Sequence, residues 1–89
     1  MIAVSFWIGK NCVRHPRISG GVTAMWRQLN ASLAERRQGS CSLDEFIAVL
    51  GDEGLHVAEV AGVQLVPGLG LKADWNLIRQ RKKYEAEVA

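Results

Sequence analysis

The chain has 89 residues and a formal net charge of +2, with 48% apolar and 22% charged residues. This length predicts a single domain over residues 1–89, and the composition is typical of a globular protein rather than a disordered or fibrous chain. A domain this short buries only about 60 to 65% of the surface of its unfolded chain, so a partner or a second copy would add stability. The apolar runs are far shorter than the roughly 20 residues of a membrane helix, and no secretory signal pattern is present. We therefore expect a cytoplasmic protein with no membrane partner.

Charge is distributed unevenly along the sequence. Residues 1–41 hold six Lys or Arg and one acid, residues 42–71 hold five acids and no Lys or Arg, and residues 72–89 hold five Lys or Arg and three acids. This pattern fits a domain with a basic face and an acidic face. It fits equally a fold in which the blocks neutralise one another.

The first half of the chain is predicted to form a strand, a loop and a helix. Residues 2–8 are rich in β-formers and apolar on both faces, which is typical of a short strand covered on both sides. Residues 9–21 contain Asn, Pro, Ser and two adjacent glycines and are expected to be a loop. From Val22 the apolar residues recur at helical spacing until Gly39 supplies a stop, so a helix is predicted between them.

A second helix is predicted directly after this stop. Ser42 precedes Glu45 by three residues at the start of an apolar run, which is the pattern of a capping box. In this motif the serine hydroxyl accepts from a free amide of the first turn. The helix is expected to end at Gly51.

The remaining residues predict a β-hairpin and a last helix. Residues 55–60 and 63–66 flank a two-residue turn, and the second strand is expected to end at Pro67-Gly68. Residues 72–88 are predicted to be helical, with Asp74 as the cap. The predicted fold class is therefore α+β, in the order N-terminal strand, two helices, β-hairpin and C-terminal helix.

No pattern of residues indicates a catalytic or metal site, so we expect neither an enzyme nor a cofactor. Cys12 and Cys41 are expected to be reduced, partly buried thiols, since no export signal accompanies them. These cysteines, with His15 and His56, could be read as metal ligands, but their spacing is not that of a zinc site.

The second half of the chain carries the pattern of a known family. The pattern is a leucine-rich helix, a glycine, two short apolar strands around a tight turn, a proline, and then an Ile-Arg pair followed by a lysine. Its counterparts here are residues 43–50, Gly54, residues 55–57 and 63–66, Pro67, Ile78-Arg79 and Lys82. Residues 42–88 thus resemble the small N-terminal docking domains of nonribosomal peptide synthetases and polyketide synthases, of the tubulysin-synthetase type.

The resemblance implies a module that binds a short, often acidic segment of a partner protein as an added strand along the hairpin edge. Basic residues of the last helix would attract the partner's charge. The partner-binding residues that it implies are His56, Ala58, Val60, Val63, Gln64, Val66, Arg79, Lys82 and Lys83. An exposed edge also follows from the residues themselves, because a hairpin needs a third strand against it, which residues 2–8 or another chain would supply.

The sequence therefore predicts a non-catalytic protein-interaction module, whose partner is another protein or a second copy in a homodimer. One alternative is a small winged-helix-like DNA-binding regulator in which the hairpin is the wing. Its nucleic-acid contacts would be Arg14, Arg17, Arg27, Arg36 and Arg37. A third hypothesis is a small inhibitor protein encoded by a mobile element, which fits the size and the segregated charges.

Overall fold

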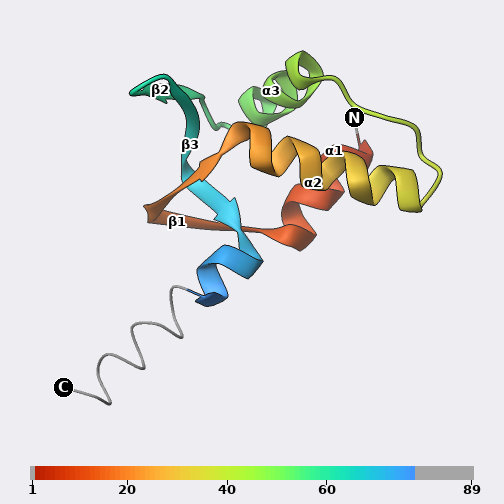
Figure 1. Cartoon of the computed structure of the whole chain (residues 1–89), viewed down its shortest axis with the longest axis horizontal. Helices are drawn as coiled ribbons and strands as arrows, with labels where there is room; N and C mark the ends of the chain where they lie inside the picture. Colours follow the sequence, from red (N-terminus) through yellow and green to blue (C-terminus); the bar gives the residue numbers. More distant parts are fainter. Residues whose placement is uncertain (1, 78–89) are drawn as a thin grey trace.

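The computed structural model describes residues 2–77 of the chain, which form helices packed against a three-stranded antiparallel sheet (Figure 1). The predicted α+β class is confirmed. Residues 72–77 are helical, and none of the helices within the described residues has the length and apolar character of a membrane crossing. The element order is α1 (Ile2–Asn11), β1 (Cys12–Gly21), α2 (Val22–Glu35), α3 (Leu43–Asp52), β2 (Ala58–Val60) and β3 (Val63–Leu71).

The N-terminal segment is helical, so the strand predicted over residues 2–8 is wrong. Val4, Trp7 and Ile8 follow one another at helical spacing and are buried in the core, whereas Phe6 is 58% exposed. An apolar run of this length fits a buried strand and a buried helix equally well, because its periodicity cannot separate the two. Packing against the rest of the chain decides between them.

The predicted loop over residues 9–21 is also wrong, because most of it is strand β1, which supplies the third strand of the sheet. β1 pairs with β3 through Arg14 opposite Leu69 and, further along, Ser19 opposite Pro67. Between these pairs, residues 15–18 of β1 face only Gly68 of β3, which has a φ of +87°. The extra residues form a bulge, and a bulge on an edge strand is a place where a proline such as Pro16 is tolerated.

Strand β3 continues to Leu71, so the strand end predicted at Pro67-Gly68 is wrong. β3 is the central strand, in the order β1-β3-β2. Its second half packs tightly against β1, since a Cβ atom placed on Gly70 would lie 2.5 Å from Cδ1 of Ile18. The predicted cap at Asp74 is wrong as well, because Asp74 lies inside the helical residues 72–77.

Both central helices were correctly predicted. α2 begins at Val22 and buries its apolar stripe, and the chain beyond it turns at Gly39 with a φ of +84°. α3 has Ser42 as its N-cap, and the backbone N–H of Glu45 donates to the Ser42 hydroxyl over 3.1 Å. Sequence-local signals were sufficient for these helices because caps and apolar spacing act within a few residues.

Two tryptophans connect the helices. The indole N–H of Trp7 on α1 donates to the hydroxyl of Ser32 on α2 over 3.2 Å. The indole N–H of Trp26 donates over 2.7 Å to the carbonyl of Cys41, whose backbone also exchanges two hydrogen bonds with the Asn30 amide. These contacts fix α1 and the segment before α3 against α2. Among the described residues, every buried side-chain nitrogen or oxygen has a hydrogen-bond partner.

Candidate functional site

The β-hairpin forms as predicted around Ala61-Gly62, although its first strand is only residues 58–60 rather than 55–60. Ala61 and Gly62 both have positive φ, of 52° and 78°, which is the geometry of the type I′ turn that joins twisted strands. The cross-strand pairs are Val60 with Val63, Glu59 with Gln64, and Ala58 with Leu65.

The predicted docking edge is mostly closed, because β3 is flanked by the chain's own strands. Leu65 pairs with Ala58 on one side and with Gly21 on the other, and Val66 pairs with Gly20. Leu65 and Val66 are therefore closed to an added strand, whereas Val63 and Gln64 pair with β2 on one side only. Among the strands that the structure describes, the outer edge on this side of the sheet is β2.

The edge of β2 offers few backbone groups. Residues that flank a two-residue turn exchange their own N–H and C=O groups, so Val60 directs its groups to β3 and, by alternation, Glu59 directs its groups outward. Within β2, the outward-facing backbone groups are therefore those of Glu59 alone. Side chains have to supply most of any contact made here.

The outer face of the hairpin is apolar. Because Val60 and Val63 are directly opposite, they project to the same face, and they are 57% and 54% exposed. Alternation places Ala58 and Leu65, both half-buried, on this face too. We call these four residues, Ala58, Val60, Val63 and Leu65, the hairpin surface.

The other residues predicted to bind a partner are scattered. His56 and Gln64 are exposed, whereas Val66 is fully buried. Val66 points to the opposite face from Val63 and belongs to the core, so its assignment to the binding surface is wrong. Arg79, Lys82 and Lys83 lie outside the described residues.

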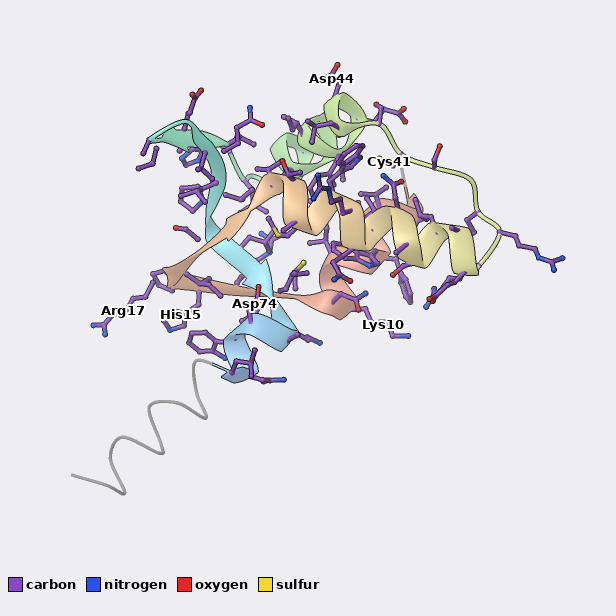
Figure 2. All side chains as sticks on the ribbon, viewed as in Figure 1. Lys10, His15, Arg17, Cys41, Asp44 and Asp74 are labelled. Carbon is purple, nitrogen blue, oxygen red and sulfur yellow. The ribbon has the colours of Figure 1, made fainter. Side chains whose placement is uncertain are left out.

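Helix α3 adds acidic side chains near the hairpin. Asp44, Glu45 and Asp52 are all exposed, and α3 contains no Lys or Arg. In Figure 1 both α3 and the hairpin lie in the upper part of the view, and residues 53–57 join them. Figure 2 shows Asp44 pointing away from the fold into solvent.

The structure does not gather the five arginines of the DNA-binding alternative. Arg14 is held by Glu53, with its guanidinium 3.0 Å from the carboxylate. Arg17 lies on the β1 bulge and points away from the fold (Figure 2), and Arg27 is exposed along α2. Arg36 and Arg37 follow α2, whose 14 residues span roughly 21 Å, so they lie far from Arg17.

A groove that the sequence did not reveal lies between α1 and the C-terminal half of α2. Its volume is about 470 Å³, and its charged lining residues among residues 2–77 are Lys10 and Arg36. Sequence reasoning missed it because residues 2–8 were assigned to a strand. Reading Ala3, Phe6 and Lys10 at helical spacing would have placed them on one face. The other lining residues are Ala3, Phe6, Trp7, Asn11, Ser32, Leu33 and Gln38.

The cysteines lie in the core as free thiols. Burial raises the pKa of Cys12 to about 11, although the positive charge of Lys72 opposes the shift. Burial and the nearby Glu45 carboxylate also raise the pKa of Cys41. Thiols of this kind are protonated and unreactive at neutral pH. Within residues 2–77, no three His, Cys, Asp or Glu side chains are grouped as metal ligands would be.

No family model, curated protein or solved structure matches the chain. The resemblance to docking domains therefore stays a prediction. Two surfaces are left as candidates for function, namely the hairpin surface beside α3 and the groove between α1 and α2.

Proposed function

We propose that the domain is a non-catalytic protein-binding module that contacts its partner protein with the hairpin surface and the adjoining helix α3. The observations that carry the proposal are the exposed Val60–Val63 pair and the acidic helix without cations that residues 53–57 join to the hairpin. The partner would present an apolar patch surrounded by Lys or Arg.

Apolar burial supports the hairpin as the centre of the contact. The large apolar side chains exposed among the described residues are Phe6, Val60, Val63 and Leu77, and two of these form one cross-strand pair. Complete burial of a valine contributes about 1.5 kcal/mol or more, so covering two half-exposed valines contributes on the order of 2 kcal/mol. Clustered apolar side chains on a small domain are typical of an interaction surface.

Charge supports a partner of the opposite sign. Asp44, Glu45 and Asp52 on α3 are exposed acids, while Glu59, opposite Gln64, is exposed on the other face of the hairpin. Complementary charges around an apolar centre accelerate association and select among partners more than they add affinity. This surface therefore favours a basic rim on the partner.

The same charges argue against DNA as the partner. A winged-helix-like regulator would need the order helix, strand, two helices and hairpin, and this chain has that order. In such a regulator α3 would be the helix that enters the major groove of DNA. Three exposed acids and no cation on that helix would repel the phosphates, whose neutralisation by Lys and Arg drives DNA binding. The arrangement is better suited to a protein partner.

The test compares one double variant with a matched control on the same hairpin. Val60→Thr with Val63→Thr keeps the β-branched shape but removes the apolar patch. Gln64→Thr changes an exposed residue on the opposite face. The tagged wild-type protein would first retain its partner from a nuclease-treated lysate of the source organism, and calorimetry with the purified partner would then give the affinities.

We expect the control to bind like the wild type and the double variant to lose at least about tenfold in affinity, with its melting temperature preserved. Tenfold corresponds to about 1.4 kcal/mol, less than the estimated burial of the two valines. Equal affinity of the double variant would refute the proposal. Retention that disappears on nuclease treatment would favour the DNA-binding alternative.

A further inference from the structure

We propose that the groove between α1 and α2 is a second binding site, which takes a short peptide segment of a partner protein carrying a large apolar side chain next to an acidic one. This site does not depend on the hairpin surface. The two lie on different elements, and Figure 2 shows Lys10 and Asp44 on opposite sides of the fold.

The floor of the groove is apolar and fixed in place. Trp7 and Leu33 are 6% and 3% exposed, and the hydrogen bond from the Trp7 indole to Ser32 ties the two helices together. Phe6, at 58% exposure, stands at the rim with its ring largely in water. The volume of about 470 Å³ is in the range of pockets that hold ligands, so a large side chain has room without rearrangement of the helices.

Within the part of the chain that the structure describes, the charges of the groove are positive and have no acidic partner. Lys10 comes from the last turn of α1 and Arg36 from the residue after α2, and no Asp or Glu of residues 2–77 lines the groove. The ion pair found among the described residues joins Arg14 to Glu53, so neither Lys10 nor Arg36 has an acidic partner there. The backbone carbonyl of Leu33, near the end of α2, already accepts a hydrogen bond from the backbone N–H of Gln38 over 2.9 Å. An acidic group on the occupant would supply the missing charge.

These features favour a peptide over a second copy of this chain as the occupant of the groove. Both cations are exposed at the rim rather than buried at the bottom, which suits a chain that lies across the groove with one side chain inserted. The acidic helix α3 of a second copy has the right charge, but its exposed residues include Ala48 and Gly51 and no large apolar side chain to fill the floor. A peptide with an aromatic or leucine anchor beside Asp or Glu satisfies both requirements.

The experiment begins with a display library of random twelve-residue peptides selected on the immobilised full chain. The best peptide is then synthesised with a fluorophore and titrated by fluorescence polarisation. The variants are Lys10→Glu with Arg36→Glu, and separately Phe6→Ser, all at exposed positions where substitution preserves the fold. Val60→Thr with Val63→Thr serves as the control, so that failure of this site is distinguishable from failure of the hairpin proposal.

We expect selected peptides to share an apolar anchor next to an acid, and affinity to fall at least tenfold in the charge-reversed variant and severalfold in Phe6→Ser. The hairpin variant should bind normally, and binding should weaken with added salt. Selected peptides without acids, or equal binding by the charge-reversed variant, would overturn the proposal. Displacement of the peptide by free 3-phenylpropionate at equal affinity would also overturn it, because a small carboxylate would then be the occupant. Self-association that the charge reversal abolishes would overturn it too, because a second copy of the chain would then be the occupant.

Discussion

Substituting Gly70 by alanine tests the pairing of β1 with β3, which holds the sheet together. The new Cβ would lie 2.5 Å from Cδ1 and 2.8 Å from Cγ1 of Ile18, which is 7% exposed and has little room to move. Forcing an extra methyl group into a packed site costs about 1 to 3 kcal/mol. For a domain of this length, about 2 kcal/mol lowers the melting temperature by about 10 °C.

The same geometry predicts how Ile18→Ala changes the result. Truncation removes the two clashing atoms and leaves the Ile18 Cβ 3.9 Å from the new methyl group, which is ordinary van der Waals contact. Ile18→Ala alone should cost about 2 to 4 kcal/mol as a large-to-small core substitution. Adding Gly70→Ala to that background should cost almost nothing, so the two effects should be non-additive by about 2 kcal/mol.

The assay is equilibrium unfolding in urea, followed by tryptophan fluorescence, for the wild type, both single variants and the double variant. Gly51→Ala is the control, because its Cβ would meet nothing within 4 Å and alanine in helix α3 should be neutral or stabilising by up to about 1 kcal/mol. If Gly70→Ala were as stable as the wild type, or if the two substitutions were additive, the register of β1 on β3 would be wrong.

Two further predictions concern the helix cap and the buried thiol. Ser42→Ala removes the acceptor for the Glu45 N–H and should lower the free energy of unfolding by about 1 kcal/mol, measured by urea unfolding, whereas Ser42→Asp should restore it. Folding raises the pKa of the Cys12 thiol from 9.0 to about 11. The contribution of this thiol to the free energy of unfolding is therefore complete below pH 9 and declines as the pH rises through 11. Relative to Cys12→Ala, the free energy of unfolding of the wild type should fall by on the order of 2 kcal/mol between pH 9 and pH 11. Parallel profiles of unfolding free energy against pH for the two proteins would contradict this.

Several features could be predicted from the sequence because their causes are local. The apolar spacing of α2, the Ser42 cap of α3 and the Ala61-Gly62 turn each depend on residues within one or two turns of backbone. The role of Val60 and Val63 in binding stays a prediction, but their pairing was anticipated, because it follows from the two-residue turn between them. The groove was not, because it needs α1 to be a helix that lies against α2.

What the tertiary structure alone decided is the sheet. Residues 12–21 contain Pro16 and adjacent glycines, which locally favour a loop, yet they pair with β3 because the bulge at residues 15–18 removes the proline from the ladder and Gly70 leaves room for Ile18. That pairing continues β3 past Pro67-Gly68 and buries Val66. The sequence thus determined α2, α3 and the turn through contacts between near neighbours. The helical state of α1 and the strand partners far apart in the chain depend on packing, which no local pattern encodes.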